Sequence, residues 1–267
     1  MWEMLEFGFM QRALAAGAVI GVMCAVVGVF TVQKGMAFMG AGIAHASFGG
    51  VALGVWWGLH PVLTAIAFCL VVGWSIAWLS LRTATREDTL IGVFFAATMA
   101  LGILVIGLVQ GYQQDLFGYM FGSILAVTTT DLAIIAVCGG LVVLALLLYG
   151  KELLFAIFDP EGAAVAGLPT TFLHLLLVSM ISLTVVVSIK VVGIVLVSAL
   201  LITPAAAAGA LSVHFGRILV LAGVIGLTAT LVGLVLSFLW DTAPGATIVL
   251  SVTAVYLLSA AIRTLRH

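Results

Sequence analysis

The sequence has very few charged residues. Of its 267 residues, 7% are Asp, Glu, Lys or Arg, whereas 64% are hydrophobic. Soluble domains carry about 25% charged residues, so this chain cannot cover a surface that faces water. Its apolar runs are continuous rather than alternating, which excludes an outer-membrane barrel and predicts an all-α polytopic membrane protein.

Several catalytic and redox motifs are also missing. The sequence has no GxxxxGK(S/T) phosphate loop, no HExxH, no GxSxG and no pair of aspartates within the apolar runs. Cys24, Cys69 and Cys138 fall in separate runs without CxxC spacing, so we expect them to be small core residues. The net charge of -1 predicts no nucleic-acid partner. These absences argue against an enzyme.

Charges and helix breakers divide the apolar residues into segments long enough to cross a membrane, which takes about 20 helical residues. We expect spans at 13–33, 36–57, 62–81, 89–109, 131–149, 171–189, 192–211, 218–239 and 246–262. The segment 110–127 is either an interfacial or re-entrant helix or part of a longer tilted span, so eight and nine transmembrane helices both fit. No soluble domain interrupts the spans, so residues 1–267 are expected to form a single membrane domain.

The basic residues predict the orientation of the chain. With nine spans and the N-terminus outside, most of them face the cytoplasm, as the positive-inside rule requires: Lys34, Arg82, Arg86, Lys151, Arg217, Arg263 and Arg266. Only Arg12 and Lys190 would lie outside. We therefore expect an extracytoplasmic N-terminus and a cytoplasmic C-terminus. The N-terminus lacks the basic start of a cleaved signal peptide, so the first span is expected to be retained.

A loop on the expected cytoplasmic side carries helix signals in FDPEGAAVAGLP (158–169). Asp159 suits the N-cap, Pro160 suits the first helical position, and Glu161 complements the helix dipole. Gly167 is suited to end the helix. The predicted helix has about seven residues, roughly 10 Å, which is too short to span a membrane. It is either a surface helix that docks into another protein or a turn between spans.

An ionisable side chain lies deep in the second expected span. His45 follows Lys34 by about 11 residues, or about 16 Å of helix, which places it close to mid-bilayer. Small residues at every fourth position, Gly42, Ala46 and Gly50, form a ridge on which another helix can pack closely. His45 lies on the adjacent ridge and should point into the protein or a cavity. It is either a metal ligand or a neutral imidazole in an interhelical hydrogen bond.

Four other residues are weaker candidates for a functional role. His60 is expected at the outer membrane surface, where it is either a metal ligand or a simple loop residue. Asp115 and Asp241 also face outside on this topology, and they either attract cations or are merely solvated. Pro204 cannot donate a backbone hydrogen bond within the span 192–211, which predicts a kink. Kinks are common in membrane helices, so no function follows from this one.

Several segments, in order along the chain, resemble the permease subunits of bacterial ABC importers for zinc, manganese and chelated iron. They are VQKGMAFMGAGIAHASFGGVALG (32–54), EDTLIGVFFAATMALGILV (87–105), FGYMFGSILAV (117–127), FDPEGAAVAGLP (158–169), KVVGIVLVSALLITPAAAA (190–208) and PGATIVL (244–250). The resemblance covers essentially the whole chain. Several motifs in one order are far more specific than any single short pattern.

The resemblance implies a helical permease in a bacterial or archaeal cytoplasmic membrane that pairs into a dimer, usually a homodimer. Its implied partners are a cytoplasmic ATPase dimer and an extracytoplasmic metal-binding protein. No permanently bound cofactor is expected, and ATP would act only through the partner subunit. The segment 158–169, including Gly162, would be the coupling helix that docks into the ATPase. Transport would occur by alternating access, with His45 as a transient ligand of the divalent ion.

The sequence departs from the family at one position of this site. The family pattern is close to G-D-x-x-x-H-A, whereas the matching residues here are Gly40, Ala41 and His45. Without the carboxylate, the site leans slightly toward zinc and leaves manganese and iron open. One alternative is a permease for a siderophore or vitamin chelate, with a wider cavity and no buried metal ligand. Another is an ATP-independent channel or carrier, which would need charged residues in its spans.

Overall fold

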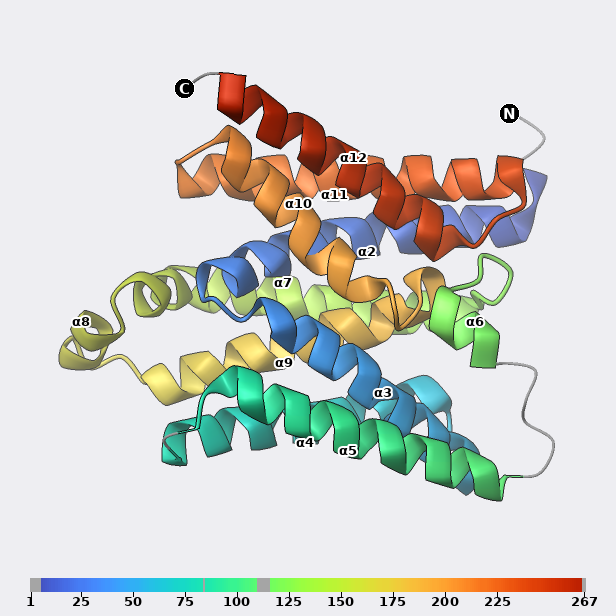
Figure 1. Ribbon diagram of the computed structural model, residues 1–267, viewed down its shortest axis with the longest axis horizontal. Coiled ribbons are helices and arrows are strands. Elements are labelled where there is room, and N and C mark those ends of the chain that lie inside the picture. The colour runs from blue at the N-terminus through green and yellow to red at the C-terminus, as the bar shows by residue number, and fades with distance from the viewer. Residues whose placement is uncertain (1–5, 84, 110–115, 266–267) are drawn as a thin grey trace. The chain divides into compact units, whose positions relative to one another are not determined.

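The computed structural model describes residues 6–83, 85–109 and 116–265, most of which form helices (Figure 1). In chain order these are α2 (Gly8–Gln33), α3 (Ala37–Trp57), α4 (Pro61–Arg82), α5 (Glu87–Leu108), α6 (Leu116–Phe121), α7 (Thr129–Phe158), α8 (Pro160–Val165), α9 (Thr170–Val192), α10 (Val197–Leu211), α11 (Phe215–Trp240) and α12 (Pro244–Leu265). Within the described residues, eight helices are long and apolar enough to cross a membrane: α2, α3, α4, α5, α7, α9, α11 and α12. The prediction of an all-α polytopic membrane protein is confirmed.

The first four long helices end close to where the sequence predicts. α3 ends at Trp57, and Gly58 follows with a φ of 67° in the left-handed region that glycine tolerates. α4 then begins at Pro61, where the missing N–H costs nothing because the first N–H groups of a helix have no partner within it. Breakers of this kind act locally, so the sequence alone locates these boundaries.

α7 is longer than predicted. The sequence indicates a span at 131–149, but the helix continues to Phe158 and has 30 residues, about 45 Å. Lys151 and Glu152 lie within it, because both residue types have good helix propensity. Charges therefore indicate where an apolar stretch ends, not where a helix ends.

The break between the expected spans 171–189 and 192–211 is also displaced. α9 continues to Val192, and α10 begins only at Val197. α10 consequently has 15 residues, about 22 Å, which is less than the roughly 30 Å thickness of the hydrocarbon core. The structure thus contains eight long helices and one short apolar helix within its described residues.

α6 explains this displaced break. Gly193 ends α9 with a φ of 91°. The next two residues pair with α6 through the main chain: the N–H of Ile194 donates to the carbonyl of Tyr119 at 2.9 Å, and that of Val195 to Met120 at 3.3 Å. α6 has six residues, so its length of about 9 Å cannot cross a membrane. Residues 110–115 of the ambiguous segment lie outside the described residues.

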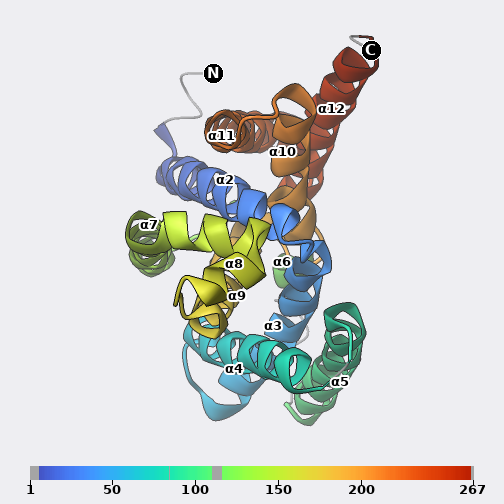
Figure 2. The same ribbon diagram turned by 90° about the vertical axis from the view of Figure 1, so that its left-hand side faces the viewer.

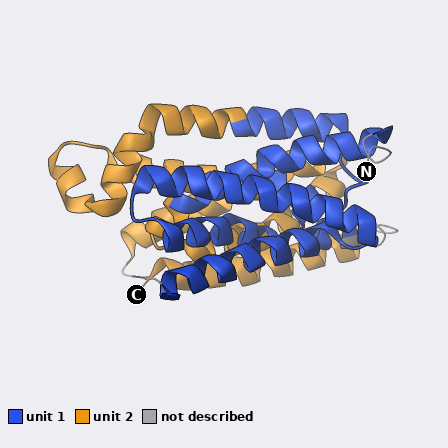
Figure 3. Cartoon of the chain, turned by 90° about the horizontal axis from the view of Figure 1, so that it is seen from above, with its two compact units in different colours: residues 1–29, 114–139, 187–267 blue, residues 30–113, 140–186 orange. Residues whose placement is uncertain are grey.

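The chain divides into two compact units, coloured separately in Figure 3. Unit 1 comprises Met1–Val29, Gln114–Gly139 and Val187–His267, and unit 2 comprises Phe30–Gln113 and Gly140–Val186. In unit 1, α10, α11 and α12 pack against one another (Figure 2). In unit 2, α3 packs against both α4 and α5. The helix that carries His45 therefore has neighbours on two sides.

Glycines allow the neighbours of α3 to approach closely. A Cβ atom on Gly42 would lie 2.6 Å from Cγ2 of Ile91 in α5. A Cβ atom on Gly50 would lie 2.6 Å from Cα of Ala65 in α4. Ala46, between the two glycines, is fully buried. Small residues let helix backbones come within dispersion contact, so the three helices form a closely packed group.

Candidate functional site

The imidazole of His45 is held in one orientation by α3 and α5. His45 is half-buried in the middle of α3, and its Nδ1 lies 2.9 Å from the carbonyl oxygen of Ala41. A carbonyl can only accept, so Nδ1 must be the donor, and the lone pair of the neutral ring is then on Nε2. The ring of Phe95, from α5, packs on the imidazole with centroids 4.5 Å apart. The ring is thus oriented as in many metal-binding histidines, with one nitrogen bonded to the protein and the other left for a ligand.

The described residues of one chain do not complete a metal site. No group of three His, Cys, Asp or Glu residues lies close enough to hold an ion in the described part of the chain. His60 immediately precedes α4 and is half-buried, and its Nδ1 has no hydrogen-bond partner among the described residues. Asp241 follows α11 in unit 1 with a left-handed φ of 51° and is exposed. Asp115 lies outside the described residues.

The segment 158–169 contains the short helix that its sequence signals predict. Oδ1 of Asp159 accepts a hydrogen bond of 2.8 Å from the backbone N–H of Gly162, which caps the helix that begins at Pro160. A Cβ atom on Gly162 would lie 2.7 Å from Cγ of Asp159, so glycine leaves room for the capping carboxylate. Gly167 follows the helix with a φ of 82°. Both expected ends of the helix are present.

α8 carries both an apolar and a charged side chain on its exposed surface. Val165, its last residue, is 90% exposed, and the exposed Glu161 lies one turn earlier. By contrast, Pro204 is buried inside α10. Its position offers packing rather than a ligand.

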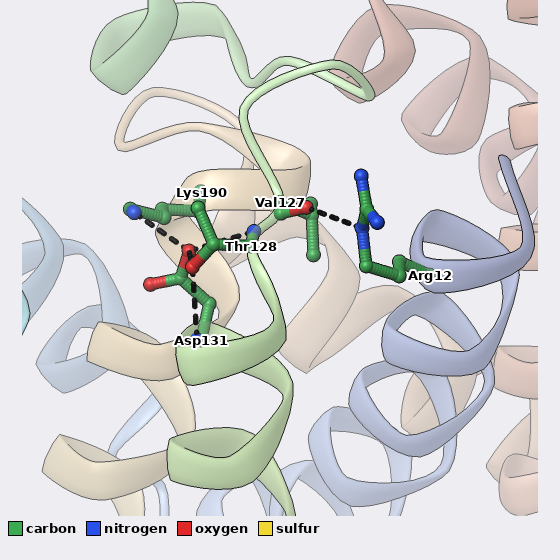
Figure 4. A network of polar contacts seen from close by, with 5 residues as sticks. All are labelled: Arg12, Val127, Thr128, Asp131 and Lys190. Atoms are coloured by element: carbon green, nitrogen blue, oxygen red, sulfur yellow. Dashed lines mark hydrogen bonds and ion pairs between the residues drawn. The ribbon is translucent and has the colours of Figure 1, made fainter. Parts of the chain in front are cut away.

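An ion pair that the sequence alone does not identify lies in unit 1, at the start of α7 (Figure 4). Nζ of Lys190 lies 2.8 Å from Oδ2 of Asp131, whose side chain is 3% exposed. The same Oδ2 accepts the backbone N–H of Thr128, while the N–H of Asp131 donates to Oγ1 of Thr128 at 3.2 Å. This reciprocal capping box has a sequence signal, T-x-x-D before an apolar run. Nearby, Nε of Arg12 donates to the carbonyl of Val127 at 3.1 Å.

Comparison with known proteins identifies the family. The profile of the ABC 3 transport family matches residues 6–263. The chain belongs to this family. It is 36% identical over 257 residues to the manganese transport system membrane protein MntC of Halalkalibacterium halodurans, covering 96% of this chain and 88% of that one.

Two further relatives in the family have names that specify other metals. The chain is 34% identical over 248 residues to the chelated iron transport system membrane protein YfeD of Yersinia pestis, covering 93% of this chain and 83% of that protein. It is 32% identical over 254 residues to the high-affinity zinc uptake system membrane protein ZnuB of Haemophilus influenzae, covering 95% and 97%. The resemblance predicted from the sequence motifs is therefore confirmed.

A solved structure supports the fold of this ABC 3 family member. The match is PsaBC from Streptococcus pneumoniae in complex with Fab, with a TM-score of 0.87 and 35% sequence identity. The match covers 96% of this chain and 92% of that chain. The arrangement of helices described above is therefore one that a solved relative shares.

Proposed function

We propose that the chain is the permease subunit of an ATP-driven importer for divalent transition-metal ions. It belongs to the ABC 3 transport family, and relatives that match almost its full length are named for manganese, chelated iron and zinc transport. The observation that carries the proposal is the imidazole in the middle of α3, whose Nδ1 donates to Ala41 and whose Nε2 is left for a ligand. The metal ion is the cargo.

His45 would hold the ion weakly and briefly. An ion that leaves water needs donors to replace part of its hydration shell, and a lone pair on Nε2 supplies one of them. A site with four protein ligands would bind the ion tightly and release it slowly, which suits a structural site rather than a pathway. The absence of a complete donor group within the described residues of one chain supports the weak, transient site.

A second copy of the chain would contribute a second imidazole. We infer that two permease chains pair, so that His45 of each copy lines one pathway. This arrangement would double the number of nitrogen donors without changing the sequence. Pairing would also explain why the half-buried ring stays accessible on one side, whereas a structural histidine packed on all sides would be covered.

The segment 158–169 would transmit movement from a separate ATPase. The sequence has no phosphate-binding loop of the GxxxxGK(S/T) type, so ATP hydrolysis is assigned to a cytoplasmic ATPase dimer. The capped α8, with Val165 exposed, offers the docking surface on that side. An extracytoplasmic protein would deliver the metal at the opposite face. With the short α10 as a ninth crossing, the bias of basic residues supports an N-terminus outside and a C-terminus in the cytoplasm.

Reconstitution in liposomes tests this function. The permease, the ATPase and the metal-binding protein are combined, and uptake of zinc, manganese and ferrous iron is measured in competition. We expect uptake only when ATP and all three proteins are present. His45→Ala should lower uptake of the free metal about tenfold, because roughly 1.4 kcal/mol of ion stabilisation is lost. His214→Ala, which alters an exposed histidine between α10 and α11, is the matched control.

Two results would contradict the proposal. Uptake that proceeds without the ATPase would indicate a channel or a secondary carrier. Transport of a bulky chelate that is unaffected by His45→Ala would indicate a siderophore or vitamin permease. In the second case the pathway would be wide and would need no ligand at His45.

A further inference from the structure

A cavity of about 210 Å³ lies within unit 2, beside segment 158–169, the proposed coupling segment. Its lining comes from the turn between α2 and α3, the ends of α4 and α7, the starts of α5 and α9, and Pro160 of α8. Most of these residues are apolar. The exceptions include three ionisable side chains, Lys34, Glu87 and His174.

Two of the ionisable side chains are in direct contact. Nε2 of His174 lies 3.3 Å from Oε1 of Glu87, at ion-pair distance although not aligned as a hydrogen bond. The side chains are 9% and 30% exposed, respectively. Oγ of Ser80 donates to the same Oε1 at 3.4 Å. Glu87 is the first residue of α5 and His174 lies near the start of α9, so this contact joins the starts of two helices.

On one side, the contact is joined to α8 by a short, hydrogen-bonded connection. The backbone N–H of Leu168 donates to the carbonyl of Ala163 at 3.0 Å, and that of Thr170 donates to Leu168 at 2.9 Å. Pro169 lies between them and has a fixed φ. α9 begins at Thr170, one turn before His174. A displacement of α8 would therefore reach His174 instead of being absorbed in a flexible loop.

On the other side, the contact is joined to the helices that hold His45. Glu87 is the first residue of α5, and Phe95, about 12 Å further along that helix, packs on the imidazole. Lys34 lies just before α3, which carries His45. Because α3 and α5 pack closely at Gly42, a shift of the start of α5 would be passed to the surroundings of His45.

We propose that His174 and Glu87 are positioning residues that connect segment 158–169 to α3 and α5. Neither is a ligand of the transported ion. When the ATPase moves α8, the His174–Glu87 contact moves the start of α5, and Phe95 moves against His45. The contact belongs to a two-state element of the kind that alternating access requires. This inference rests on the proposed function, because it describes how ATP hydrolysis would reach the ion pathway.

The test compares ATP hydrolysis with metal uptake in the same proteoliposomes. His174→Gln and Glu87→Gln keep the approximate size of each side chain, and they remove the imidazole ring and the negative charge, respectively. We expect each variant to lower the number of ions imported per ATP about tenfold, a typical coupling energy, while ATP hydrolysis stays within about twofold of wild type. The double variant should be no worse than either single variant, because the two residues act as one unit.

Two matched controls separate this role from general effects of substitution. Asp88→Asn alters the neighbouring carboxylate of α5, which is exposed and does not line the cavity. His214→Gln alters an exposed histidine of unit 1. Both controls should retain wild-type ions per ATP. If the single variants fail to fold, His174→Glu combined with Glu87→His exchanges the two groups and should restore the contact and the coupling.

The outcomes distinguish this inference from the proposed function. If the wild-type protein shows no ATP-dependent metal uptake, the proposed function is wrong, and this inference is wrong with it. If the wild type imports metal but His174→Gln and Glu87→Gln keep the wild-type ions per ATP, only this inference is overturned. A parallel fall of hydrolysis and uptake, with an unchanged ratio, would overturn it too, because that pattern indicates a purely structural role.

Discussion

Nδ1 of His45 donates to the carbonyl oxygen of Ala41, one turn earlier in α3, at 2.9 Å. The imidazole is therefore oriented by the main chain, and no side chain at position 41 is needed for this. The family pattern that this stretch resembles, G-D-x-x-x-H-A, implies an aspartate at the position of Ala41. Its carboxylate would then add a metal ligand rather than orient the histidine, which makes the metal preference of this chain testable at one position.

Ala41→Asp should shift the preference from zinc toward manganese. Side chains four residues apart lie on one face of a helix, so the new carboxylate would lie beside His45, and manganese favours oxygen donors more than zinc does. We expect the ratio of manganese to zinc uptake to rise roughly three- to tenfold. Competitive uptake in proteoliposomes measures the ratio. Ala41→Asn, which has the same shape but no charge, is the control, and an equal shift in both variants would contradict the explanation.

Val165→Asp should weaken binding of the ATPase. A contact that covers this 90% exposed side chain would bury an unpaired carboxylate in the variant. We expect the dissociation constant between permease and ATPase to rise at least about tenfold, measured in detergent or nanodiscs. Val213→Asp changes a valine that is 89% exposed in the connection between α10 and α11. If both variants weaken binding equally, docking is not specific to α8.

Gly50→Ala should destabilise unit 2. The new methyl group would lie 2.6 Å from Cα of Ala65, a backbone atom that cannot move without displacing α4. Overpacking of this kind costs about 1–3 kcal/mol. Unfolding of the detergent-solubilised protein by heat or denaturant measures the loss. The control is Gly92→Ala in α5. Among the described residues, no atom outside the neighbouring backbone of α5 would lie within 4 Å of the new Cβ, so this variant should be neutral or slightly stabilising. Equal loss in both variants would mean that helix contact is not the cause.

Asp131→Asn should destabilise the start of α7. Asparagine can still accept from Thr128, but the ammonium group of Lys190 would lose its carboxylate, at a cost of about 1–3 kcal/mol. The double variant Asp131→Asn with Lys190→Met removes both charges and keeps an acceptor for Thr128. It should be more stable than Asp131→Asn in the same unfolding assay, because no unpaired charge remains. A double variant that is less stable than the single one would show that the ion pair is not the source of the loss.

The sequence predicts the helices whose ends are set by local chemistry. The turn at Gly58 and Pro61 and the cap at Asp159 involve neighbouring residues only, so their signals are legible in the chain itself. The end of α9 is different, because Gly193 turns where α6 supplies main-chain partners from 75 residues earlier. The sequence does not predict the length of α7 for a different reason. A charged residue does not by itself end a helix.

The same distinction applies to the candidate site. His45 is identifiable from the sequence because an ionisable side chain within an apolar span is unusual. Its neighbour Phe95 is not, because an aromatic residue in such a span is ordinary and its contact with α3 is a long-range one. Glu87 and His174 are likewise far apart in the sequence, and each alone reads as a polar residue near the end of a helix.

The pairing of α6 with the turn after α9 has a consequence for sequence variation. Since its hydrogen bonds join main-chain atoms, these bonds do not depend on which side chains stand at positions 119 and 120. A side chain at Gly193 would disrupt this pairing, because an added methyl group there would lie 2.6 Å from the carbonyl carbon of Phe121. A random mutagenesis screen of this region would recover almost no substitutions at Gly193. A residue without a side chain is therefore among those that the fold can replace least easily.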